Sequence, residues 1–136
     1  MKNLVTLFLV SAVLLMPACK KNNTSERFKL LTEPVWSSDS LIADGVEAGG
    51  PGQFLENFNG DAKFREDGTG YFGNYQGDWI FSPDETKLTI TTDSLPLPIT
   101  CNIKELTSAS LKITTSVINP ENMTDLVDIR MTFKAK

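Results

Sequence analysis

From Lys29 onward, apolar and polar residues alternate with a period of two. The clearest run covers residues 127–134, where Val, Ile, Met and Phe alternate with Asp, Arg, Thr and Lys. Residues 97–104 and 111–117 repeat the pattern. Successive side chains of a β-strand point to opposite faces, so this period is typical of strands with one buried face. No comparable helical stripe appears from Lys29 onward, and we predict an all-β fold.

Turn signals such as Asp67-Gly68 and Asn119-Pro120 separate the alternating runs. The predicted strands cover residues 29–39, 62–65, 70–75, 77–82, 87–92, 97–106, 110–117 and 125–134. Eight strands in a meander expose two edges, and closing the sheet removes them. We therefore predict a single antiparallel eight-stranded up-and-down barrel, with a β-sandwich as the alternative.

One predicted connection, residues 41–60, is long and rich in glycine. We expect a mobile loop at one mouth of the barrel, with a short helical turn at residues 53–58 acting as a lid. Phe54, Leu55 and Phe58 lie within this turn. Apolar side chains in such a loop are candidates for gate residues.

The first residues have the pattern of an export signal. Lys2 provides a short basic region, and residues 4–16 are apolar except for one Thr and one Ser. This run is shorter than the about 20 residues that a transmembrane helix needs, but it has the length of the apolar region of a secretory signal. A small residue, Ala18, directly precedes Cys19.

The segment Met16-Pro17-Ala18-Cys19 resembles the lipobox of bacterial lipoproteins, with Met16 where Leu is usual. The resemblance implies that residues 1–18 are a signal peptide and that Cys19 carries diacylglycerol and a third acyl chain, such as palmitate. Several chains make a firm membrane anchor, whereas one chain alone binds marginally. A buried first helix with an incidental cysteine is the alternative.

Residues 20–26 contain no apolar side chain, which is typical of a polar tether. We assign residues 19–27 to a lipidated tether and 28–136 to the barrel domain. Lys20-Lys21 lacks both the Asp that retains some lipoproteins on the inner membrane and the acidic run of some surface-exported ones. The lipoprotein resemblance thus implies a place in the cell envelope, on the outer membrane and facing the periplasm.

Removal of the signal leaves 118 of the 136 residues, the size of one domain. The whole chain has 13 basic and 17 acidic side chains, and the signal takes one Lys, so the remainder has a formal net charge of −5. This charge disfavours nucleic acid as a partner. The chain has no His, which removes Ser-His-Asp and Cys-His catalysis and His-based metal sites. We expect a non-catalytic protein without a cofactor.

Several motifs resemble the small lipocalin-like domains of lipoproteins from Gram-negative bacteria. They are residues 31–36, the hairpin from Phe64 through Asp67-Gly68-Thr69 to Tyr71, Gly77-Asp78-Trp79, Leu88-Thr89-Ile90, residues 99–103 and residues 111–113. The similarity extends over residues 29–134. The long Gly-rich loop and Pro34 depart from the usual pattern. The resemblance implies a barrel, and it specifies no ligand.

Six aromatic residues are the candidate ligand-binding residues, namely Trp36, Phe54, Phe58, Tyr71, Tyr75 and Trp79. Trp36 and Trp79 could wall a pocket, but large aromatics on barrel strands are usually structural plugs, and we favour that role. Tyr71 and Tyr75 are predicted to share one strand face. Their hydroxyls would either meet a ligand or lie at the rim.

Cys101 falls on the apolar face of its strand. We interpret it as an inert core thiol, because reactive thiols need exposure and positive neighbours. The acids at 61–67, 84–85 and 121–125 lack the spacing of a calcium loop and are interpreted as solvated turn residues.

Two functions fit these features. The first is a membrane-anchored binding module that takes a small apolar or amphipathic ligand into the barrel mouth. The second is a protein-interaction module, an inhibitor or accessory subunit of an envelope complex, with a filled barrel. An apolar cavity of about 300 Å³ or more would favour the first.

Overall fold

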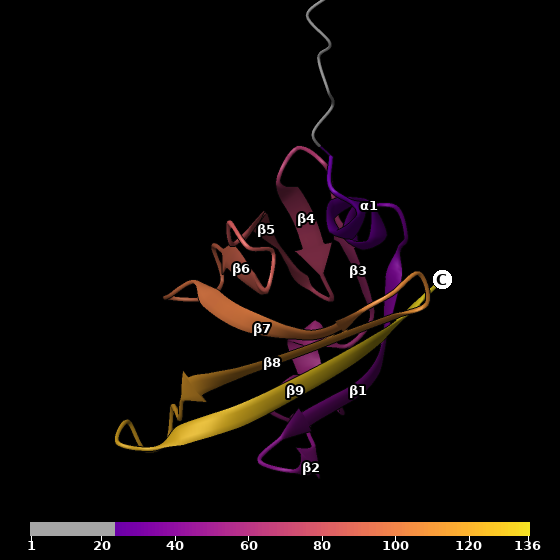
Figure 1. The fold of residues 1–136 in the computed structure, drawn as a ribbon. Coiled ribbons are helices and arrows are strands. Elements are labelled where there is room, and N and C mark those ends of the chain that lie inside the picture. Colours follow the sequence, from indigo (N-terminus) through magenta and orange to yellow (C-terminus); the bar gives the residue numbers. More distant parts are fainter. Residues whose placement is uncertain (1–23) are drawn as a thin grey trace, which may run out of the picture.

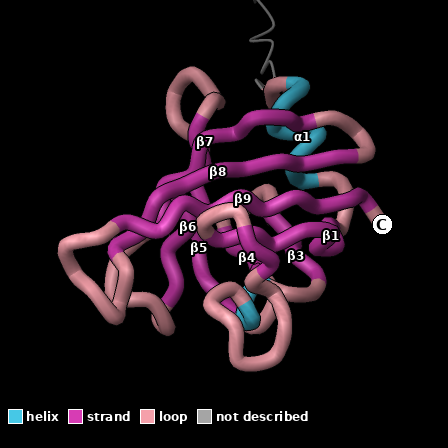
Figure 2. Tube along the Cα trace, turned by 90° about the horizontal axis from the view of Figure 1, so that it is seen from below, coloured by secondary structure: helices cyan, strands magenta, loops and turns pink. Residues whose placement is uncertain are grey.

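The computed structural model describes residues 24–136. Eight strands close into an antiparallel barrel with a short helix at one end, so the predicted all-β barrel is confirmed (Figures 1 and 2). The elements are α1 (Glu26–Thr32), β1 (Trp36–Ala43), β2 (Val46–Glu47), the 3-10 turn η1 (Glu56–Phe58), β3 (Asp61–Phe64), β4 (Thr69–Phe72), β5 (Tyr75–Phe81), β6 (Lys87–Thr92), β7 (Ile99–Leu106), β8 (Ser110–Ile118) and β9 (Leu126–Ala135). The predicted signal peptide and Cys19 lie outside the described residues.

The barrel closes through β1. This strand pairs with β9 from Trp36↔Ala135 to Ala43↔Ile129, and with β3 only at Trp36↔Ala62 and Ser37↔Asp61. Strands β3 to β9 follow one another as antiparallel neighbours, whereas β2 pairs with the end of β1 alone. Closure pairs the two edges that an open meander would expose. Beyond Ser37, β1 leaves β3, and the chain from 44 to 60 fills the resulting gap.

The amino-terminal end of the domain differs from the prediction. The first strand begins at Trp36 and not at Lys29, and Glu26–Thr32 form a helix. Ser25 caps this helix, since its Oγ accepts a hydrogen bond from the Phe28 amide at 3.0 Å. The end of the predicted tether is therefore part of the folded domain.

Helix α1 is fastened to the β5–β6 turn. The Ser25 hydroxyl donates to the Glu85 carboxylate, and Arg27 Nε donates to the Glu85 carbonyl at 3.1 Å. The ring of Phe28 packs on Trp79 at a centroid distance of 5.6 Å. These contacts hold the apolar face of the helix over one opening of the barrel (Figure 1).

The barrel interior at the α1 end is filled. Leu31 and Trp36 are completely buried, and the Trp36 indole Nε1 donates to the Leu31 carbonyl at 3.0 Å. The rings of Phe64 and Trp79 meet edge to face at 5.7 Å. Other buried apolar side chains complete the core, including Leu88, Ile90, Cys101, Leu111, Ile113, Met131 and Phe133. We call this the closed end. Within residues 24–136, no helix is long and apolar enough to cross a bilayer.

Truncation of the helix should open a cavity at the closed end. We expect Leu31→Ala to lower the free energy of unfolding by about 2–5 kcal/mol, because the neighbouring strands cannot collapse into the space. The nearby Lys29→Ala, at an exposed helix position, should change it by less than about 0.5 kcal/mol. Urea denaturation followed by circular dichroism measures both. A loss below about 1 kcal/mol for Leu31→Ala would contradict a plugging role for α1.

Candidate functional site

The end of the barrel opposite α1 opens into a cavity of about 550 Å³, which we call the mouth pocket. Its wall consists of residues of the long connection, the connection between β6 and β7, and the ends of β7, β8 and β9 that lie at this mouth. The lining residues are Phe54, Leu55, Phe58, Tyr75, Leu95, Pro96, Leu97, Pro98, Ile99, Thr100, Thr115, Ser116, Val117, Ile118, Pro120 and Ile129. We call the three connections at this end, residues 44–60, 93–98 and 119–125, the mouth loops.

The lining is apolar with a few hydroxyl groups and contains no Asp, Glu, Lys or Arg. Thr115 Oγ1 donates to the Thr100 carbonyl at 2.8 Å. The Tyr75 hydroxyl accepts a long hydrogen bond, 3.4 Å, from the Asn57 amide. Such a lining suits the apolar part of a ligand and provides no charged partner for a buried ionic group.

The long connection forms a fixed wall of the mouth pocket and not a free loop. The Ala48 amide donates to the Leu41 carbonyl at 2.7 Å, and the Leu55 amide donates to the Ala48 carbonyl at 2.8 Å. Of the helical turn predicted for residues 53–58, the 3-10 turn η1 covers only Glu56–Phe58. Phe58 is buried there and meets the Tyr75 ring edge to face at 4.9 Å.

A glycine explains how closely this wall approaches the β4–β5 turn. Gly73 has φ +61°, and a Cβ at this position would lie 2.3 Å from the Asn57 carbonyl oxygen. The adjacent Asn74 amide donates to that same oxygen at 2.8 Å. A side chain at Gly73 would therefore push the wall away from the turn.

The structure brings together three of the six candidate residues. Phe54, Phe58 and Tyr75 line the mouth pocket, with Phe54 44% exposed at the entrance. Trp36 and Trp79 are buried and lie outside that lining, as expected of structural plugs. The Trp79 indole donates to the Arg65 carbonyl at 2.9 Å.

The prediction that Tyr71 and Tyr75 share one strand face was wrong. Tyr71 lies on β4 and Tyr75 on β5, because the chain turns at residues 73–74. Gly70 and Phe72 point inward from β4, so Tyr71 points outward, where the Arg65 guanidinium lies 5.5 Å from its ring centroid. Tyr71 does not line the mouth pocket.

The wall formed by the β6–β7 connection was not predicted from the sequence. The prediction began a strand at Leu97, but β7 begins at Ile99. Pro96 and Pro98 have no amide hydrogen to donate to a sheet, so the chain bulges out and its leucines meet the pocket. Two leucines alternating with two prolines before a strand are the signal that could have identified this wall.

The other chemically notable side chains serve the structure. Cys101 is completely buried, as the prediction of a core residue requires, and this burial raises the pKa of its thiol to about 12. Hydrogen bonds from the Ser82 and Thr86 hydroxyls lower the pKa of Asp84 to about 2. Among the described residues, no group of three or more Cys, Asp or Glu side chains could hold a metal ion.

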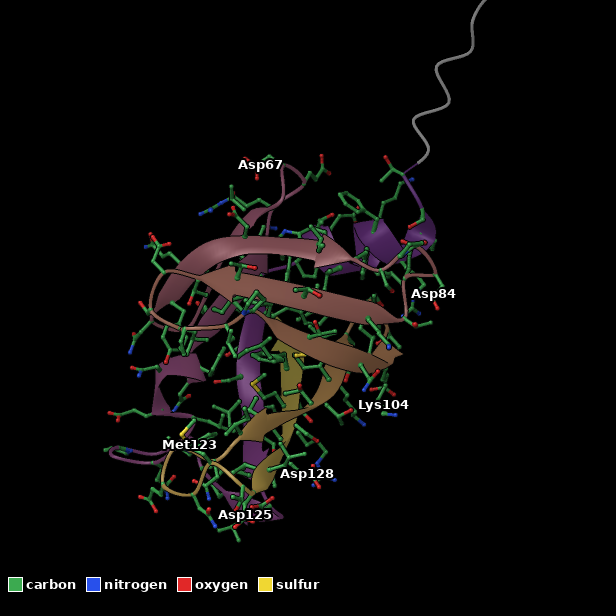
Figure 3. The ribbon with its side chains drawn as sticks, turned by 90° about the vertical axis from the view of Figure 1, so that its left-hand side faces the viewer. Asp67, Asp84, Lys104, Met123, Asp125 and Asp128 are labelled. Carbon is green, nitrogen blue, oxygen red and sulfur yellow. The ribbon has the colours of Figure 1, made fainter. Side chains whose placement is uncertain are left out.

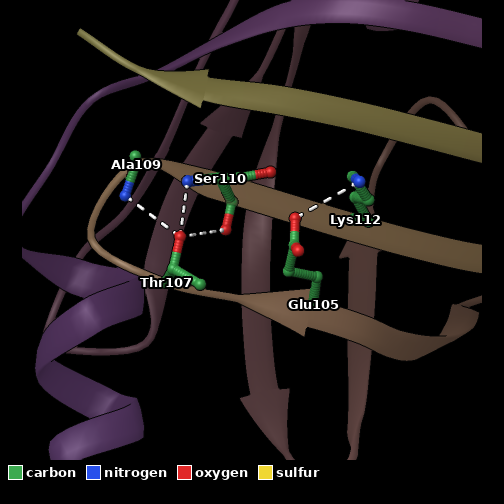
Figure 4. A network of polar contacts seen from close by, with 5 residues as sticks. All are labelled: Glu105, Thr107, Ala109, Ser110 and Lys112. Atoms are coloured by element: carbon green, nitrogen blue, oxygen red, sulfur yellow. Dashed lines mark hydrogen bonds and ion pairs between the residues drawn. The ribbon is translucent and has the colours of Figure 1, made fainter.

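At the β7–β8 turn, polar side chains likewise form contacts with neighbouring groups of the same turn (Figure 4). The Thr107 hydroxyl accepts hydrogen bonds from the Ala109 and Ser110 amides at 3.2 and 3.0 Å. A Lys112 Nζ to Glu105 ion pair of 3.4 Å lies beside it. These exposed contacts fix a turn.

A second hollow of about 620 Å³ lies on the outer face of β7, β8, β9 and β1. It is lined by outward-pointing polar residues, including Asn102, Thr114, Asp128 and Arg130. The hollow adjoins the mouth pocket, with which it shares Thr100, Thr115, Ser116 and Ile129, but its own lining also includes the charged side chains of Asp128 and Arg130. The concave, apolar mouth pocket is therefore the candidate functional site.

Comparison with known proteins finds no family model that matches this chain and no curated protein that is significantly similar to it. Its function is therefore inferred from the geometry and chemistry of the mouth pocket.

Proposed function

We propose that this protein is a non-catalytic binding module whose mouth pocket takes up a small apolar or amphipathic molecule. The observation that carries the proposal is an apolar cavity of about 550 Å³ at one end of a barrel whose other end is filled. Small-molecule sites are typically about 300–1,000 Å³ and mostly apolar. Eight strands also enclose enough space for one small ligand.

Exposed apolar side chains around the entrance support this function. Leu97 is 65% exposed and Ile118 is 49% exposed, although both line the mouth pocket. Leu126 pairs with Ile118 across β8 and β9 and is 64% exposed. Transfer of this surface from water to contact with a ligand contributes about 25 cal/mol per Å².

We further propose that lipid on Cys19 anchors the domain to the envelope, with the outer membrane as the site and the periplasm as the compartment. Cys19 precedes the helix cap Ser25 by six positions in the sequence. A chain of this length reaches at most about 22 Å. Since the chain enters the domain at α1, this anchor would hold the closed end toward the bilayer and leave the mouth pocket open to the aqueous side.

A protein-interaction role is the second candidate function. Val46, 68% exposed, and Met123, 79% exposed, lie on mouth loops but do not line the mouth pocket. A protein partner could cover these side chains, whereas a ligand confined to the pocket would leave them in water.

Binding can be measured with N-phenyl-1-naphthylamine, a neutral apolar dye that fluoresces when it leaves water. A fragment of residues 24–136 is suitable, because β1 and β9 close its barrel and α1 completes its core. We expect saturable binding, and about tenfold weaker binding for Phe54→Ser and for Leu97→Ser, since each variant removes an apolar contact.

The matched control is Ile80→Ser. Ile80 and Leu97 are similarly exposed, at 64% and 65%, but Ile80 does not line the mouth pocket. Its variant should bind the dye with unchanged affinity. Absence of saturable binding, or equal losses in all three variants, would contradict the proposed function.

The anchor is tested separately with the full chain. A Cys19→Ser precursor expressed in a Gram-negative host should lose the membrane partitioning of the parent in detergent phase separation, because serine cannot accept the diacylglycerol. Partitioning equal to that of the parent would show that Cys19 is not the anchor.

A further inference from the structure

The mouth loops carry acids and no bases. Their six acidic residues are Asp44, Glu47, Glu56, Asp93, Glu121 and Asp125, and their sequences contain neither Lys nor Arg. Three of these acids flank the mouth pocket in the chain, since Glu56 follows Leu55, Glu121 follows Pro120 and Asp93 lies two positions before Leu95. The mouth loops therefore have a formal net charge of −6.

The bases of the domain lie elsewhere. Arg27 and Lys29 belong to α1, and Arg65 and Lys87 lie at turns of the closed end. Figure 3 shows Asp125 and Met123 at the opposite end of the molecule from Asp67, which lies near α1.

Ion pairs do not neutralise the mouth loops. The pairs formed by the described residues are Lys112 with Glu105, Lys134 with Asp39 and Lys136 with Asp61, all outside the mouth loops. Arg130, on the outer face of β9, does not line the mouth pocket, but it lines a neighbouring hollow together with Gly45 of the first mouth loop. No ion pair of the described residues neutralises an acid of the mouth loops.

We infer that the ligand of the mouth pocket is a small cationic amphiphile, whose apolar part enters the pocket while its positive group stays at the acidic rim. This inference rests on the proposed function and specifies its ligand class. The uncharged lining excludes a buried ion pair, so the charge must remain where it is hydrated. Acids of one sign around a low-dielectric cleft attract a cation and repel a carboxylate.

An aromatic ring at the entrance suits the same ligand class. Phe54 lines the mouth pocket and is 44% exposed, so one part of its ring is available at the rim. The face of an aromatic ring attracts a cation within about 6 Å. Phe54 can thus contact both parts of an amphiphile, the alkyl chain and the charged group.

Three ligands with one alkyl chain and different charges test the inference. Octylammonium, octanol and octanoate are each titrated against the dye bound to residues 24–136 at pH 7 and low ionic strength. We expect octylammonium to bind at least about fivefold more tightly than octanol, and octanoate to bind most weakly. The difference should shrink at about 0.5 M salt, where charges are screened within a few ångströms.

Charge-neutralising variants locate the effect. Asp93 and Glu121 are exposed, and their carboxylates accept no hydrogen bond from the described residues, so Asp93→Asn with Glu121→Gln should leave the fold intact. This double variant should reduce the preference for octylammonium over octanol by about threefold. The matched control, Glu33→Gln with Glu66→Gln, removes two exposed acids outside the mouth loops and should retain the preference.

The outcomes separate the two proposals. Equal affinity for octylammonium and octanol, or tighter binding of octanoate, would overturn the cationic ligand while the binding function stands. Displacement of the dye only by a basic peptide would also overturn it, in favour of a protein partner. Failure of the dye itself to bind would contradict the proposed function.

Discussion

The rest of the structure depends on the burial of Leu31 of α1 at one end of the barrel. The Trp36 indole donates a hydrogen bond to the Leu31 carbonyl there at 3.0 Å. This contact lies where helix α1 gives way to strand β1, and it closes one end of the barrel with a helix. Because α1 and the aromatic rings of Phe64 and Trp79 fill that end, the remaining interior lies at the other end. The mouth pocket thus exists because α1 and these aromatic side chains fill only the closed end of the barrel.

The mouth of the barrel combines an apolar lining with an acidic rim. Its lining is apolar and uncharged, while the loops around it carry acids without bases. An apolar cavity supplies binding free energy through surface removed from water, and charge at the rim selects among ligands and speeds their approach. In the proposed orientation, with the lipid anchor beside α1, both properties face away from the membrane.

The repeating pattern of the strands made the barrel predictable, but not its ends. Period-two alternation located β6 to β9 within a few residues because each has one buried face. Helix α1 was missed because seven residues are too few to show a helical period. Phe54 and Phe58 were found because apolar residues in a Gly-rich loop are unusual. Tyr71 was placed on the wrong face because a turn at Gly73 interrupts the predicted strand. Across this turn Tyr75 pairs with the inward-pointing Phe72, whereas Tyr71, the neighbour of Phe72, points outward.

The central claim about this protein is that its mouth pocket is the part of the molecule that contacts the ligand. Methyl chemical shifts of residues 24–136, followed by nuclear magnetic resonance during titration with octylammonium, test this directly. We predict saturable shifts at Leu97, Ile99 and Val117, and none at Leu31 and Leu111 in the filled end. Shifts centred on the outer face of β7 to β9, or on no defined region, would contradict the account.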